Sequence, residues 1–199
     1  MLIKNIKIEK SIAQICQSLK EARLKRNISQ LQISRQIKTS VKTISRLENK
    51  KMNVSYYYFF AYIYFLHFNS NVIELIEDRY SDIVFEICSY KRIVTSDPVL
   101  KFMTDVISRI ILVREQCKIS KEIISDRTGL EINQIEKIEN IEKNLSLLLF
   151  LSYCNSLNIL DIITESLSYK HDEIGNNLIM QEIRRSGRKY VRPSNSNKC

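Results

Sequence analysis

Apolar residues recur at three- and four-residue spacing near the start of the chain, as they do on one face of an amphipathic helix. Ser29 and Ser40 each precede a further short segment, residues 30–37 and 41–49, and serine is well suited to cap a helix N-terminus. Only a short turn separates these two segments. The pattern predicts a long helix followed by a helix, a tight turn and another helix. The apolar residues of the first face are Ile12, Ile15, Leu19 and Ala22.

The next segment, residues 56–68, is almost wholly aromatic or aliphatic. It is much shorter than the roughly 20 residues that a bilayer-spanning helix needs, so we expect a buried helix and no membrane association. The chain holds only 3 Gly and 2 Pro, which leaves little turn chemistry for hairpins. The fold class expected from these patterns is all-α.

Charge is concentrated in the segment that holds the first helices. The net charge of the chain is +9, and residues 1–53 carry 13 Lys or Arg against 3 Asp or Glu. Residues 96–169, by contrast, carry 8 basic and 11 acidic side chains. A dense basic block attracts polyanions, and DNA binding releases its condensed counterions, so nucleic acid is the expected partner of the first segment.

The third predicted helix has an outward face suited to a groove in DNA. Ile44 and Leu47 fall on its inner side, which leaves short polar side chains and one long arginine outside. Such side chains can reach base edges without holding the helix away from the major groove. The outward residues are Val41, Lys42, Thr43, Ser45, Arg46 and Asn49.

Over about residues 12–76 the chain resembles the lambda-repressor-like (Cro/CI, or XRE) helix-turn-helix domains. The resemblance is carried by Arg23, Ile28-Ser29-Gln30, Ile33-Ser34, the run from Thr43 to Asn49, Lys51 and Ser55. It implies a five-helix domain in which Gln30 contacts a phosphate and braces the first base-reading residue. It implies that base edges are faced by Val41, Lys42, Thr43 and Arg46. It also implies that the DNA backbone is held by Ser40, Asn49 and Lys51.

The resemblance further implies a structural salt bridge between Arg23 and Glu48, which would join the first helix to the third. Two residues depart from the family pattern. Lys38 stands in the turn after the second helix, and Lys50 follows the third helix, where the family usually has glycine. Each lysine must then accept or change a conformation that favours glycine, at a cost of about 1 kcal/mol per site.

The pattern recurs without a gap when the chain is shifted by 91 residues, from Ile28 to Ile119. Residues 103–167 are therefore expected to form a second domain of the same fold, with the salt bridge repeated as Arg114 and Glu139. Residues 38–51 carry five Lys or Arg and one Glu, whereas residues 129–142 carry one Lys and four Glu. We expect the second copy not to read DNA as a matching module, but to serve packing, dimerisation or a protein partner. Weak DNA contact remains open through Asn133, Gln134 and Lys137.

Four parts of the chain are expected: a basic DNA-binding domain at 1–80, a connector at 81–97, an acidic second domain at 98–169 and a basic mobile tail at 170–199. Residues 82–88 fit either a helix or a short strand. Asp97 can cap the helix that Pro98 opens. The tail either adds non-specific attraction to phosphates or only solubilises the chain.

The sequence gives little support for catalysis or for metal or cofactor binding. The 5 Cys are scattered without a CxxC pair, and His67 and His171 stand alone, so we expect no catalytic residues, no metal and no cofactor. The N-terminal residues alternate Lys with Ile and lack the apolar stretch of a secretory signal, which favours a cytoplasmic location.

The function expected from the sequence is a nucleoid-associated transcription regulator, repressor-like, that binds double-stranded DNA as a homodimer with half-sites about one helical turn apart. The alternative is an adaptor or antitoxin-like protein in which residues 98–169 grip another protein and DNA binding is autoregulatory. In a third interpretation the two copies in one chain approximate two half-sites. The acidic residues of the second copy count against that interpretation.

Overall fold

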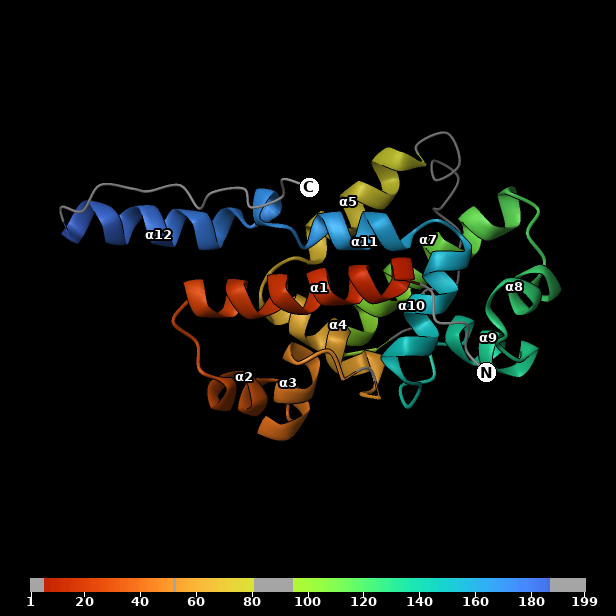
Figure 1. Ribbon diagram of the computed structural model, residues 1–199, viewed down its shortest axis with the longest axis horizontal. Coiled ribbons are helices and arrows are strands. Elements are labelled where there is room, and N and C mark those ends of the chain that lie inside the picture. Colours follow the sequence, from red (N-terminus) through yellow and green to blue (C-terminus); the bar gives the residue numbers. More distant parts are fainter. Residues whose placement is uncertain (1–5, 52, 81–94, 187–199) are drawn as a thin grey trace.

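The computed structural model describes residues 6–51, 53–80 and 95–186, and every regular element in these residues is helical, as expected (Figure 1). A first set of five helices is α1 (Ile6–Lys25), α2 (Gln30–Gln36), α3 (Val41–Glu48), α4 (Tyr56–Phe65) and α5 (Asn69–Arg79). A second set is α7 (Pro98–Gln116), α8 (Lys121–Thr128), α9 (Ile132–Glu139), α10 (Leu147–Ser156) and α11 (Leu160–Ser166). A 3₁₀ turn (η2, Tyr169–His171) and α12 (Glu173–Ser186) follow. The expected helix or strand at residues 82–88 lies outside the described residues.

The helices begin where the sequence places caps. The Ser29 side chain accepts a hydrogen bond from the Gln32 amide, and the Ser40 side chain accepts one from the Thr43 amide. Asp97 caps α7 by accepting from two backbone amides, and Pro98 is the first residue of that helix, as predicted. Because each cap satisfies backbone donors that a helix start leaves free, these side chains fix the boundaries of α2, α3 and α7.

The backbone enters the left-handed region at positions that recur between the two sets. Within the described residues, every positive φ angle belongs to one of four pairs whose members lie 91 residues apart. The pairs are Asn27 (52°) with Lys118 (53°), Lys38 (52°) with Gly129 (71°), Lys50 with Ile141 (both 62°), and His67 (62°) with Asn158 (59°). Of the two expected alternatives, Lys38 and Lys50 therefore accept the backbone conformation that favours glycine and do not change it. The helix ends of the two sets are built alike.

The two sets meet at an antiparallel bridge between Ser55 and Ser146, which lie just before α4 and α10. The bridge is reciprocal: Tyr56 N donates to Leu145 O at 3.0 Å, and Leu147 N donates to Val54 O at 2.7 Å. The donor Leu147 lies 91 residues after the donor Tyr56, and the acceptor Leu145 lies 91 residues after the acceptor Val54. The two bonds are therefore equivalent, with the two sets exchanged. The bridge is therefore approximately two-fold symmetric, with equivalent residues of the two sets exchanged across it.

The fifth helix of each set packs against the first helix of the other set: α5 lies on α7, and α11 lies on α1. The Arg109–Glu77 ion pair joins α7 to α5, and Lys7 lies 2.8 Å from Asp161 between α1 and α11. This exchange leaves one continuous hydrophobic cluster. The two sets, which were expected to form two domains, therefore bury their apolar faces against each other, and packing between them was one of the roles expected of the second set.

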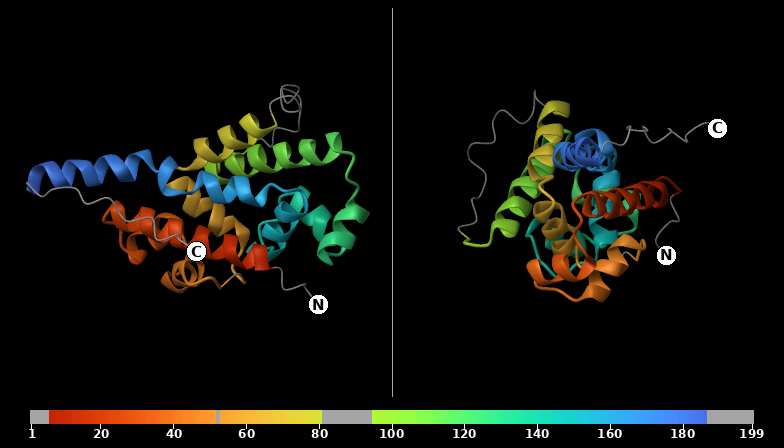
Figure 2. Two further views of the ribbon diagram at one scale, coloured as in Figure 1. Left: turned by 45° about the horizontal axis from the view of Figure 1, so that its top comes forward. Right: turned by 90° about the vertical axis from the view of Figure 1, so that its left-hand side faces the viewer.

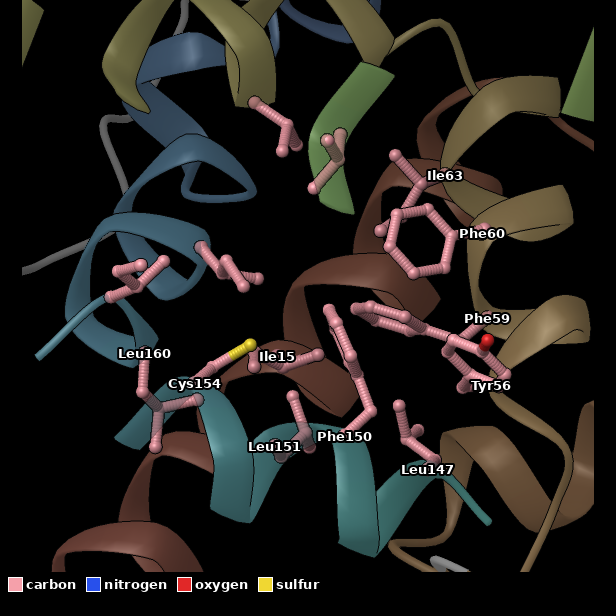
Figure 3. Close-up of a cluster of buried hydrophobic side chains, with 14 of the residues drawn as sticks. Ile15, Tyr56, Phe59, Phe60, Ile63, Leu147, Phe150, Leu151, Cys154 and Leu160 are labelled. Atoms are coloured by element: carbon pink, nitrogen blue, oxygen red, sulfur yellow. The ribbon is translucent and has the colours of Figure 1, made fainter. Parts of the chain in front are cut away.

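Aromatic side chains fill the centre of the cluster, where α4 meets α10 (Figure 3). The rings of Tyr56 and Phe60 approach that of Phe150, with centroids 5.5 and 5.2 Å apart. The aromatic segment forms a largely buried helix, as predicted, although α4 ends at Phe65 rather than at Phe68. No single helix in the described residues is long and apolar enough to cross a membrane, and the α10–α11 pair that reaches such a length is bent by 115°.

Residues 169–186 correct the predicted tail, since they form η2 and α12 rather than irregular chain. The carboxylate of Asp172 is buried and lies 3.2 Å from Lys25 Nζ and 2.7 Å from an Arg26 guanidinium nitrogen. These ion pairs hold the start of α12 against the end of α1, and the rest of α12 extends beyond it (Figure 2). The mobile tail predicted for residues 187–199 lies outside the described residues.

Candidate nucleic-acid interface

The third helix presents the side chains expected to face bases. Ile44 and Leu47 are 0% and 1% exposed and hold α3 on the core. The opposite side is open, with three exposed residues, Val41, Lys42 and Arg46, and with Thr43 half-buried. The helix therefore places all four predicted base-facing residues on its outward side.

The residues expected to hold the DNA backbone lie at the two ends of α3. Ser40 caps the N-terminus, and its hydroxyl lies 2.9 Å from that of Thr43. Asn49 follows the last residue of α3, and its side-chain amide donates to Ser45 O at 2.8 Å. Ser40, Asn49 and Lys51 are all exposed. The structure thus places them at the two ends of α3 and leaves them accessible, and their contact with the DNA backbone stays a prediction.

A buried ion pair fixes the orientation of α3 relative to α1. Arg23 Nε and Nη2 donate to the two carboxylate oxygens of Glu48 at 2.6 and 3.0 Å, as the resemblance implied. The hydroxyl of Tyr62 on α4 donates to Glu48 Oε1 at 2.6 Å. The sequence patterns assign Tyr62 no role, although Tyr153 stands 91 residues after it. Arg23, Glu48 and Tyr62, which we call the brace, thus join three helices.

The protonation of Glu48 follows from its partners. Burial alone would raise the pKa of Glu48, but hydrogen bonds from Arg23, Tyr62 and Gln30 outweigh burial and hold the pKa below its ordinary value. The pKa of Tyr62 is raised, first by burial and then by its bond to Glu48. The carboxylate is therefore charged at neutral pH, and the tyrosine keeps its proton as a donor.

Gln30 takes a place that differs in part from its predicted one. Its side-chain amide donates to Glu48 Oε2 at 2.8 Å, so it supports the brace instead of the first residue of α3. The side chain remains partly exposed at the start of α2. Its predicted contact with a phosphate stays a prediction.

The brace recurs in the second set of helices. Arg114 Nε donates to Glu139 Oε1 at 2.8 Å, and the Tyr153 hydroxyl donates to the same oxygen at 2.8 Å. Lys121 occupies the position equivalent to Gln30, and its Nζ lies 3.7 Å from Glu139 Oε2 and 3.1 Å from Glu136 Oε1. The two predicted salt bridges are therefore present, each with a tyrosine and a polar residue at equivalent positions.

The outward sides of α9 and α3 carry different residue types, and the acidic residues of α9 stand only at certain positions. Where α3 has its four base-facing residues, α9 has Ile132, Asn133, Gln134 and Lys137. The acidic residues Glu131, Glu136 and Glu142 stand instead at the positions of Ser40, Ser45 and Lys51. The positions equivalent to the base-facing ones are thus free of acidic residues, which the total charge of the segment does not reveal.

Thiols and metal-binding residues add no second candidate site. Cys16 and Cys154 are buried and Cys117 is exposed, and burial raises the pKa of Cys16 to about 11. In residues 6–51, 53–80 and 95–186, no group of His, Cys, Asp and Glu side chains is suited to hold a metal ion.

Comparison with known proteins agrees with this geometry. A family model described as helix-turn-helix matches residues 19–62, from the second half of α1 into α4. No curated protein and no solved structure matches the chain. The match and the arrangement of α2 and α3 define this part of the chain as a helix-turn-helix, a motif of DNA-binding transcription regulators.

Proposed function

We propose that the protein is a sequence-specific DNA-binding transcription regulator, repressor-like, that reads the major groove with α3. The observation that carries this proposal is the outward face of α3. Val41, Lys42 and Arg46 are exposed there, on a helix capped by Ser40 and held by the brace, within the segment that matches the helix-turn-helix model. A reading helix needs such fixed placement, because base contacts tolerate little positional error.

The exposed residues fit base recognition by type. Lys42 and Arg46 can donate to guanine O6 and N7, and the methyl groups of Val41 and Thr43 can meet the thymine methyl. Exposed lysines at positions 38, 50 and 51 flank the helix and suit contact with phosphates. Base contacts would give the sequence preference, and the flanking lysines would give most of the affinity.

The second set of helices is proposed to be a divergent copy of the first. Four pairs of left-handed residues and the repeated brace, Arg114, Glu139 and Tyr153, support this proposal. A copy would explain why the pairs all have the same separation in sequence. The predicted homodimer remains a prediction.

We also propose that the protein does not catalyse a reaction and that it lies in the cytoplasm, associated with the nucleoid.

The second candidate function is an adaptor or antitoxin-like protein in which residues 98–169 bind another protein. The acidic residues around α9, Glu131, Glu136 and Glu142, favour a basic partner for that role.

Binding isotherms test the proposed function. A duplex selected by the protein from a random DNA pool is compared with a scrambled duplex, for the natural chain, Lys42→Ala and Arg46→Ala. We expect each substitution to remove about 1 to 3 kcal/mol of the preference for the selected duplex, while the scrambled duplex loses little affinity.

Arg79→Ala is the matched control, because Arg79 is an exposed arginine at the end of α5. It should leave the preference unchanged. If Lys42→Ala and Arg46→Ala weaken both duplexes equally, or if no duplex is selected from the pool, α3 does not read bases and the proposal fails.

A further inference from the structure

The two sets of helices are arranged in a way that resembles the two subunits of a DNA-binding dimer. The bridge between Ser55 and Ser146 is reciprocal, and the packing of α5 on α7 and of α11 on α1 is reciprocal in the same way. The two sets are therefore related by an approximate two-fold rotation, with equivalent elements on opposite sides of the bridge. Figure 1 shows α2 and α3 to one side of the junction between α4 and α10, and α8 and α9 to the other.

This arrangement is what a homodimer of helix-turn-helix domains provides. The two strands of DNA are related by two-fold axes, so a symmetric pair of such domains meets two half-sites about one helical turn apart. Here the pair is formed inside one chain and shares a continuous core. The same chain thus contains a second helix, α9, at the position equivalent to α3.

The outward side chains of α9 fit base edges by type. Asn133 is exposed, and its side-chain amide can pair with adenine N6 and N7. Gln134 is half-buried, and its Oε1 accepts from Glu131 N at 3.1 Å in the cap of α9, which leaves its side-chain NH₂ to donate to a base. Lys137 can donate to guanine, and Ile132, which is 41% exposed, can meet a thymine methyl. These are the positions equivalent to those of α3 that are expected to face bases.

The acidic residues occupy the flanking positions. Glu131 and Glu142 replace Ser40 and Lys51, which are expected to hold the DNA backbone, and repulsion from phosphates there weakens binding. Lys121 lies 3.1 Å from Glu136 and offsets its charge. The second half of the molecule is thus built to add sequence preference with little affinity of its own.

We infer that a single chain is the DNA-binding unit and that it spans two unlike half-sites, α3 reading one and α9 the other. This inference rests on the proposed function of α3. It replaces the predicted homodimer by a two-fold pair within one chain. The operator should then be an imperfect inverted repeat whose two halves differ in sequence.

The first test is hydroxyl-radical footprinting on a duplex selected from a random pool, together with the mass of the complex in solution. We expect protection in two successive major-groove segments on one face of the duplex, with one chain bound. Lys137→Ala and Asn133→Ala should each lower the preference at base pairs of one half-site by roughly 5- to 150-fold, and Arg46→Ala should do so only in the other half-site. Asn177→Ala, an exposed asparagine on α12, is the control and should change neither.

The second test restores a phosphate-holding charge. Glu142→Lys gives the second set the residue found at the equivalent position, Lys51, and Glu165→Lys makes the same charge change at an exposed site on α11. We expect Glu142→Lys to tighten binding several-fold and to steepen the slope of log affinity against log salt by about 1. Glu165→Lys should do so less.

Two outcomes would overturn the inference: two chains on each duplex, or a single protected half-site with equal effects of the Glu142→Lys and Glu165→Lys substitutions. In both cases Arg46→Ala could still change the preference at its own base pairs. The proposed function of α3 would then survive the failure of this inference. A protein that selects no duplex from the pool would contradict both.

Discussion

Glu48 is the residue on which the placement of α3 depends most. Its side chain is 3% exposed and accepts hydrogen bonds from Arg23, Tyr62 and Gln30. Because the carboxylate balances the buried guanidinium, neutralising one member leaves a charge without its counter-ion inside the protein.

We expect Glu48→Gln to lower the free energy of unfolding by about 3 to 5 kcal/mol, as measured in urea. Glu165→Gln, at an exposed site, should lower it by less than about 0.5 kcal/mol. Equal losses in the two variants would show that the buried brace does not stabilise the fold.

The same carboxylates predict how stability depends on pH. The pKa values of Glu48 and Asp172 lie below their ordinary values of 4.5 and 3.8, because hydrogen bonds and cations outweigh burial. A carboxyl whose pKa is lowered by folding stabilises the native state above its unfolded pKa, and this contribution is lost as pH falls through the folded pKa. Unfolding followed by circular dichroism should therefore show stability falling below about pH 4.5. Constant stability between pH 5 and pH 2 would be the contrary result.

At the scale of single residues, helical spacing predicted the outward face of α3, and the resemblance to a known family implied the Arg23–Glu48 pair. Tyr62 was missed because its hydroxyl reaches Glu48 from another helix, and spacing within a helix says nothing of such a contact. Gln30 has two hydrogen-bonding atoms, and its sequence position does not decide between its partners.

At the scale of helices, the turns after α2 and α3 are built on lysine in the left-handed region, where glycine costs less. We expect Lys50→Gly to raise the free energy of unfolding by about 0.5 to 1 kcal/mol, since the relief of strain exceeds the entropy that glycine adds to the unfolded chain. Gly129→Ala should lower it, because Gly129 has a φ of +71°. Thermal unfolding of both variants measures the two effects, and a loss of stability in Lys50→Gly would contradict them.

Caps made the starts of α2, α3 and α7 predictable, because serine or aspartate before a run of helical spacing is a local signal. The helix α12 was not predicted. Its polar and charged composition suggested a tail, and its attachment depends on the contact of Asp172 with Lys25 and Arg26 far along the chain. Local composition does not show such a long-range contact.

At the scale of the whole molecule, the sequence predicted two similar sets of helices but not the way in which the two sets pack. The exchange of α5 and α11 joins residues that are distant in sequence, and nothing in either copy alone distinguishes packing against itself from packing against the other. The sequence therefore did not show that the buried residues of both sets form one continuous cluster.

One core predicts one cooperative unfolding transition. Calorimetry should give equal calorimetric and van't Hoff enthalpies, and residues 1–80 alone should not fold, because the apolar faces of α4 and α5 would lack α10 and α7. Two resolved transitions, or a folded fragment of residues 1–80, would show that the first set is independent of the second.

The most direct test of α3 as the reading helix is to repeat selection from a random DNA pool with Arg46→Ala beside the natural chain. Arg46 is exposed, so its removal should leave the fold intact. We expect both proteins to select the same site, except that Arg46→Ala loses its preference at one or two adjacent base pairs. An unchanged site, or a uniform loss of preference at every position, would contradict base reading by Arg46.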